Sequence, residues 1–216
     1  LEQEGKRWRF SHDLIRAELR KTAKARPNWS ALNLQAAHMR EKRADADPTG
    51  IELEVVARHY WEAQLPETAL RLGLKGLSRL HAGGLMGHAT SFARRLLKWN
   101  GECSLLQPSD QGELLLLASI AAEHAGQPRK AQEYASDAVE VARSGALDSL
   151  GARSAGRMGV LNLQQDDPES AEKWLWDALR FARASGDSRA LSDVHLSLGF
   201  FYQRRGESDL ALTAYR

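Results

Sequence analysis

The stretch "HLSLGFFYQRRGESDLALTAYR" (residues 195–216) decides the fold of this chain. It holds a Leu-Gly pair at 198–199, an aromatic residue at Tyr202, a Gly-Glu break, and an alanine at Ala211. Before the break, apolar residues recur at helical spacing and mark one face of a helix. After the break a second apolar run begins. The stretch therefore predicts two helices joined by a tight turn and packed through small residues.

The same pattern occurs twice more upstream at a fixed spacing. An alanine follows the turn in each copy, and successive copies lie 40 residues apart, at Ala131, Ala171 and Ala211. Small residues stand twelve positions earlier, at Ser119, Gly159 and Gly199. Fixed self-similarity at a period of 20 to 50 residues indicates a stack of repeats. The sequence therefore predicts an all-α, right-handed solenoid of helical hairpins with 40-residue repeats.

Helix start and stop signals support the hairpins. Pro128 and Pro168 stand where the second helices are expected to begin, a position at which the missing N–H costs nothing. Gly145 and Gly186 stand where those helices are expected to end, and we expect both in the left-handed conformation of a C-terminal cap.

The last unit resembles the tetratricopeptide repeat (TPR). That family carries Leu-Gly, a tyrosine three residues after the glycine and an alanine twelve after it, matched here by 198–199, Tyr202 and Ala211. The middle unit keeps the glycine and the alanine but has Asn162 at the tyrosine position. The usual TPR period is about 34 residues. A longer second helix or exit loop is expected to supply the difference. The resemblance implies a protein-binding scaffold.

Three regions are predicted along the chain: a basic segment over 1–45, irregular helical hairpins over 51–100, and TPR-like repeats over 109–216. Residues 1–43 hold 11 Lys or Arg against 5 Asp or Glu. A linker is expected within 41–50 because it contains a proline and a glycine. The expected irregular helices cover 51–64, 66–84 and 85–100, followed by a polar loop over 100–112. The expected repeat units are 109–148, 149–188 and a truncated 189–216.

The basic segment carries a second resemblance. "RWRFSHDLIRAEL" (7–19) is similar to the stretch that ends a winged-helix region in bacterial STAND-type signal-transduction ATPases, some fused to a protein kinase, just before their helical repeats. Trp8 and Phe10 predict a short strand here, and Ser11 the cap of a helix. The resemblance implies the TPR region of a cytoplasmic regulator. The chain starts without Met and halts within a second helix, so we expect it to be part of a longer protein, with any ATPase or kinase activity elsewhere.

Catalytic, metal and cofactor chemistry finds no support in the sequence. The seven histidines are scattered, Cys103 is alone, and "AGGLMGHAT" (82–90) lacks the lysine of a phosphate-binding loop. No apolar run approaches the roughly 18 to 20 residues of a membrane span. We therefore expect no enzyme, metal, cofactor or membrane span. The lone cysteine is typical of a reducing cytoplasm.

The candidate site is the concave face of the solenoid, which the first helices of stacked repeats line. The polar residues that the family's register places there are the candidate partner contacts: Glu123, Arg153, Arg157, Gln164, Asp193, Gln203 and Arg204. Arg153 and Arg157 lie one turn apart and can meet an acidic segment. The apolar positions of the same register, such as Leu116, Ile120 and Val160, are expected in part in the core between repeats.

The leading interpretation is a non-catalytic scaffold or sensor module of a larger bacterial signalling regulator, which binds a protein or peptide, or its own parent's upstream domains. One alternative is a nucleic-acid-binding regulatory arm through the basic residues of 6–43, whose binding would weaken steeply with salt. Another is a small-ligand sensor. Self-association is also predicted through the apolar face around Leu210, Leu212 and Tyr215.

Overall fold

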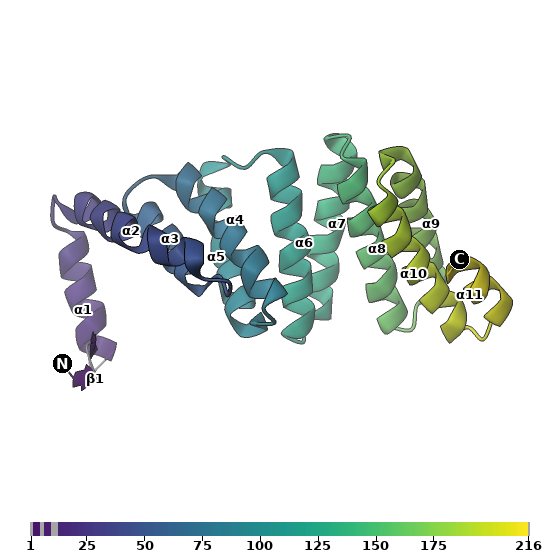
Figure 1. The fold of residues 1–216 in the computed structure, drawn as a ribbon, viewed down its shortest axis with the longest axis horizontal. Coiled ribbons are helices and arrows are strands. Elements are labelled where there is room, and N and C mark those ends of the chain that lie inside the picture. The colour runs from purple at the N-terminus through teal and green to yellow at the C-terminus, as the bar shows by residue number, and fades with distance from the viewer. Residues whose placement is uncertain (1, 5–6, 10–12, 216) are drawn as a thin grey trace.

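The computed structural model describes residues 2–4, 7–9 and 13–215, which form an elongated array of helices with the two ends far apart (Figure 1). In chain order the elements of this part are β1 Glu2–Glu4, β2 Arg7–Arg9, α1 Asp13–Lys24, α2 Trp29–Ala46, α3 Ile51–Glu62, α4 Pro66–Ala82, α5 Met86–Cys103, α6 Pro108–His124, α7 Pro128–Ser144, α8 Asp148–Gln164, α9 Pro168–Ser185, α10 Ser188–Arg204 and α11 Ser208–Tyr215.

The two strands form a small antiparallel ribbon in which Gln3 lies opposite Trp8. A short strand was expected around Trp8 and Phe10, and β2 includes Trp8. Phe10 and the expected capping residue Ser11 lie outside the described residues, and α1 begins at Asp13.

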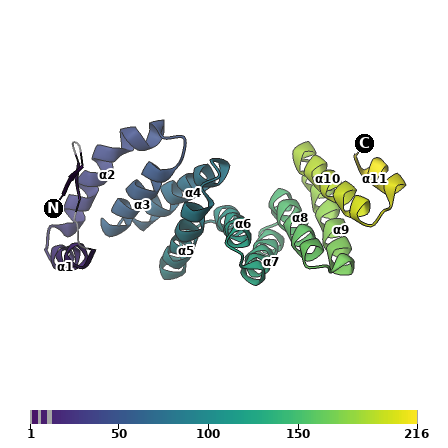
Figure 2. The same ribbon diagram turned by 90° about the horizontal axis from the view of Figure 1, so that it is seen from below.

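Helices α6 to α9 build two hairpins of the predicted kind. α6 and α8 lie along one side of the array and α7 and α9 along the other (Figure 2). α6 and α7 have 17 residues each, and three-residue connections complete the 40-residue unit. The exit connection is therefore short, and the two helices share the length of this unit equally.

One turn geometry recurs at the connections inside the hairpins. The N–H of Gln127 donates to the carbonyl of Ala122 at 2.9 Å, and the N–H of Glu207 donates to that of Tyr202 at 3.0 Å. This bond closes a Schellman motif, which requires a left-handed residue just before the donor. Gly126 and Gly206 supply it, with φ of 68° and 75°.

The expectation for the helix ends was half right. Gly186 is left-handed, with φ of 65°. Gly145 is not, because its φ is −91°, and the next residue, Ala146, takes the left-handed position with φ of 51°. The hydrogen bond from the Leu147 N–H to the Ala142 carbonyl requires the residue before Leu147 to be left-handed. That residue is Ala146, although a glycine stands one position earlier.

Small residues bring the two helices of a hairpin together, as predicted. A Cβ on Gly159 would lie 2.6 Å from Cγ of Leu175 and 3.3 Å from the carbonyl oxygen of Ala171. A Cβ on Gly199 would lie 2.2 Å from the ring of Tyr215. The shortest of these distances are well below van der Waals contact, so a larger residue at either position would force Leu175 or Tyr215 to move.

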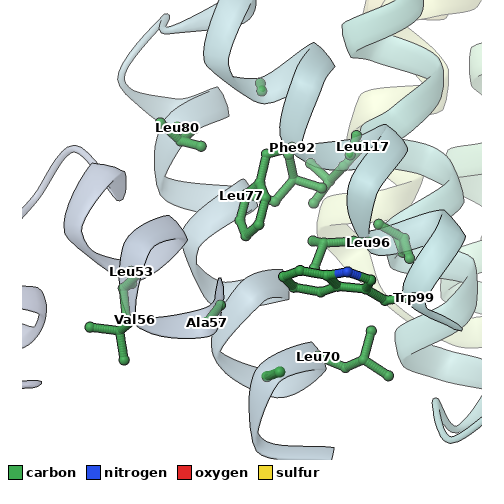
Figure 3. Packing of buried hydrophobic residues seen from close by; sticks show 14 of the residues in the cluster. Leu53, Val56, Ala57, Leu70, Leu77, Leu80, Phe92, Leu96, Trp99 and Leu117 are labelled. Carbon is green, nitrogen blue, oxygen red and sulfur yellow. The ribbon is translucent and has the colours of Figure 1, made fainter. Parts of the chain in front are cut away.

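The upstream helices α3, α4 and α5 contribute aromatic side chains to a buried cluster that also includes residues of α2 and α6 (Figure 3). Trp61 stacks on Trp99 with ring centroids 4.7 Å apart, and Phe92 meets Trp99 edge-on at 6.4 Å. α5 continues to Cys103, through residues 100–103 that were expected to form a loop. The helix continues past the buried Trp99, and the Cys103 thiol of the added turn donates to the Trp99 carbonyl at 3.1 Å.

The expected linker over 41–50 is an ordered junction. Residues 41–46 belong to α2, and the N–H groups of Thr49 and Glu52 donate to the carboxylate of Asp47 at 2.9 Å each. The hydrogen bond from Thr49 is the main reason that the pKa of Asp47 lies below its ordinary value. Arg79 of α4 then donates to the carbonyl oxygens of Ala44 and Asp47. These bonds fix the entry into α3.

Candidate functional site

A groove opens on the side of the array formed by α6, α8 and α10. Its cavity measures about 240 Å³. The residues that line it, hereafter the α6–α8–α10 groove, are Leu116, Ile120, Ala152, Arg153, Gly156, Arg157, Val160, Ala190, Asp193, Val194 and Ser197. Because each of the three helices is the first of its hairpin, the groove lies on the face that the repeat register predicted.

Arg157 is held firmly at the edge of this groove. Its Nη2 donates to Oε2 of Glu123 at 2.5 Å, and its Nε donates to Oγ of Ser119 at 3.3 Å. Only 14% of the Arg157 side chain is exposed. Burial raises the pKa of Glu123, but hydrogen bonds from Arg157 and Gln164 outweigh it and hold the pKa below its ordinary value. The pair is therefore ionised at neutral pH and ties α8 to α6.

Arg153 forms a second bridge between the same helices. Its two terminal nitrogens donate to the two carboxylate oxygens of Glu113 at 2.8 and 3.1 Å. Both side chains remain partly exposed, so solvent weakens this pair more than the first. The bidentate geometry still orients the guanidinium. Arg153 also lines a second cavity of about 480 Å³ at the start of α8, beside Ser109 and Ser149.

All seven predicted contact residues lie on α6, α8 and α10, but the structure separates them into groups. Arg153, Arg157 and Asp193 line the groove. Glu123 is the ion-pair partner of Arg157, and Gln164 contributes to lowering the pKa of Glu123. The other two are not among the lining residues: Gln203 accepts a hydrogen bond from the Tyr215 hydroxyl at 3.1 Å, and Arg204 is exposed.

Sequence reasoning undervalued the apolar part of the groove. Leu116, Ile120 and Val160 were expected in part in the inter-repeat core. Leu116 does lie there, 4% exposed and clustered with Ala142 and Leu150. Ile120 and Val160 are partly exposed, and all three line the cavity. The signal was present, because these three occupy positions of the same concave register. Preference for polar side chains as contacts hid it, although the centre of an interface is usually apolar.

Two buried serines beside the groove differ in hydrogen bonding. Ser119 donates to the carbonyl of Ala131 at 2.7 Å, whereas the Ser154 hydroxyl has no partner within the part of the chain that the structure describes. An unsatisfied buried polar group costs about 1–3 kcal/mol. We therefore expect Ser154→Ala to raise the free energy of unfolding by about 1 kcal/mol, and Ser119→Ala to lower it by about as much. Urea titration of both variants checks this, and a shift in the same direction for both would contradict it.

Three cations of the basic segment form ion pairs with α3. Arg20 and Lys24 of α1 bind Glu62 of α3 at 2.9 and 2.7 Å, and Arg40 of α2 binds Glu52 at 2.9 Å. These bridges hold the first two helices onto α3. They leave fewer free cations for nucleic acid than the composition suggested.

The lone cysteine and His88 have ordinary structural contacts in the described residues. The Cys103 thiol donates to the carbonyl of Trp99 at 3.1 Å, and exposed His88 lies 3.4 Å from Glu54. No group of three or more His, Cys, Asp or Glu side chains in this part could hold a metal ion. None of its helices combines the length and the apolar character needed to cross a membrane.

No protein-family model and no curated protein matches the chain. Several solved structures are similar to it in fold. The chain is similar to BtubC (BKLC) from P. vanneervenii, at 18% identity and a TM-score of 0.55, over 87% of this chain and 69% of that one. It is similar to the apo form of RapI at 13% identity and a TM-score of 0.63, over 93% of this chain but only 56% of RapI. It is also similar to MamA at 14% identity and a TM-score of 0.54, over 88% and 90% of the two chains. These structures are TPR-like helical solenoids, and at such identities the likeness shows the fold alone. The chain is accordingly an all-α, TPR-like solenoid of helical hairpins.

Proposed function

We propose that this chain is a non-catalytic protein-interaction module that binds a protein or peptide segment in the α6–α8–α10 groove. One observation carries the proposal: an apolar floor lies beside arginine side chains already fixed in place by Glu113 and Glu123. A preformed site of this kind loses little conformational entropy on binding, because its polar groups are ordered before the partner arrives.

The side chains of the groove support binding more than catalysis. Among the described residues that line it there is no histidine, cysteine or lysine, and Asp193 is the one carboxylate. A catalytic nucleophile needs a base within hydrogen-bond reach. Ser197, the hydroxyl of the groove, instead donates to the backbone carbonyl of Asp193 at 3.0 Å.

We further propose that the module serves as a scaffold or sensor in a larger, cytoplasmic bacterial signalling regulator. The support is the sequence of residues 7–19, which is similar to the stretch that precedes the helical repeats in STAND-type ATPases. The partner would be another protein or an upstream domain of the same parent.

The groove proposal is tested with a random 12-residue peptide display library selected on the whole chain. Val160→Lys places a charge on the apolar floor, and we expect it to weaken binding of the selected peptides at least about tenfold, as loss of a buried apolar contact predicts. Val141→Lys on α7 is the matched control, because Val141 does not line the groove. Isothermal titration measures both. Equal affinity for the two variants, or no selected peptide at all, would overturn the proposal.

A further inference from the structure

Three charged residues in and beside the groove occupy equivalent positions of successive repeats. Glu113, Arg153 and Asp193 lie 40 residues apart and stand at equivalent positions on α6, α8 and α10. The first two of these residues, Glu113 and Arg153, form a bidentate ion pair. The third, the exposed Asp193, forms no ion pair with any Lys, Arg or His of the described residues.

The second arginine of the groove is also paired with a carboxylate. Arg157 is neutralised by Glu123 and further held by Ser119. Two arginines thus face three carboxylates, counting their ion-pair partners, and the excess negative charge is that of Asp193. Both guanidiniums already have a carboxylate partner, so an acidic ligand gains less from charge pairing at this site. A basic ligand meets an unmatched carboxylate.

The apolar floor lies in the same cavity as this carboxylate. Val194 follows Asp193 directly on α10, and Ile120 and Val160 complete the wall from α6 and α8. A cavity of about 240 Å³ accommodates one or two apolar side chains and little more. Charge and shape together define two adjacent requirements, one for a cation and one for an apolar group.

We propose that the partner is a peptide segment that places a lysine or arginine on Asp193 and an apolar side chain, next to it, on the floor of the groove. This inference rests on the proposed function and specifies the chemistry of its ligand. Complementary charge at such a contact adds specificity, because ligands of the wrong sign are repelled.

The test uses the peptides selected on the whole chain. We expect their consensus to pair a basic residue with an apolar one. In a synthetic consensus peptide, replacing the basic residue by norleucine should weaken binding at least about threefold, as a partly exposed ion pair allows. Asp193→Asn should weaken binding of the basic peptide by a similar factor and leave the norleucine peptide unchanged. Asp209→Asn on α11 is the control, since that exposed carboxylate lies outside the groove.

The outcomes separate the two proposals. A neutral or acidic consensus whose binding is lost in Val160→Lys but unchanged in Asp193→Asn would overturn the basic ligand and leave the groove as the binding site. Additive effects of norleucine and Asp193→Asn would also overturn it, because they would show that the two groups do not interact. Failure to select any peptide would overturn both proposals.

Discussion

Phe92→Ala is expected to lower the free energy of unfolding by about 3–5 kcal/mol, the range for truncating a buried aromatic residue. Phe92 is fully buried and belongs to the hydrophobic cluster that α2 to α6 form (Figure 3). Its ring meets Trp99 edge-on, and a Cβ on Gly73 would be 3.4 Å from its Cζ. Helices on several sides keep the cavity from collapsing, so the cost of the lost contacts is not recovered.

Urea unfolding followed by circular dichroism measures the loss. Met39→Ala is the matched control, because 82% of Met39 is exposed and its truncation should change stability by less than about 0.5 kcal/mol. Repeats contact only their neighbours, so hydrogen-exchange protection should fall first in α3 to α5 and later in α8 to α10. A loss below about 1 kcal/mol in Phe92→Ala would contradict the core assignment.

Gly50→Ala is expected to cost about 2–5 kcal/mol, because it combines two penalties. Gly50 has a φ of 86°, a left-handed conformation that costs an L-residue roughly 1–2 kcal/mol. A Cβ there would also lie 2.4 Å from the carbonyl oxygen of Gly76 and 2.9 Å from Cβ of Arg79. Since the first of these atoms is backbone, no rotamer change relieves the clash, and α3 must move away from α4.

Gly84→Ala isolates the first penalty. Gly84 has a φ of 70°, but a Cβ on it would meet nothing within 4 Å. Its replacement should cost only the backbone strain, about 1 kcal/mol. Thermal unfolding of the two variants compares them directly. Equal losses would show that the contact between Gly50 and α4 contributes nothing to stability.

The hairpin of α3 and α4 was expected only as an irregular unit, although the sequence carries the TPR-like spacing. Ala57, Tyr60 and Ala69 repeat the spacing of Gly199, Tyr202 and Ala211, and they lie in α3 and α4. The alignment on a 40-residue period passed over them, because α5 intervenes and Ala69 stands 62 residues before Ala131. An insertion of one helix leaves the local pattern intact but destroys the period.

The pattern of charged contacts was predictable only in part. Glu113 and Arg153 occupy equivalent positions of successive units, so their pairing follows from the register. Arg157 pairs with Glu123, which is 34 residues away and not at an equivalent position. That choice depends on the rotamers of two long side chains and on the spacing of α6 and α8, which no periodicity specifies.

The sequence by itself determined the helices, the turns and the stacked hairpins, because helical periodicity, small-residue spacing and breakers are local properties that recur every 40 residues. It also placed all seven candidate contacts on α6, α8 and α10. The tertiary structure alone decided which of them remain available. Arg153 and Arg157 are matched by carboxylates across the repeat boundary, whereas Asp193 is not, and apolar side chains complete the groove. Whether a charged side chain is free to bind a partner depends on the distances between helices. Those distances are set by packing and not by the order of residues along the chain.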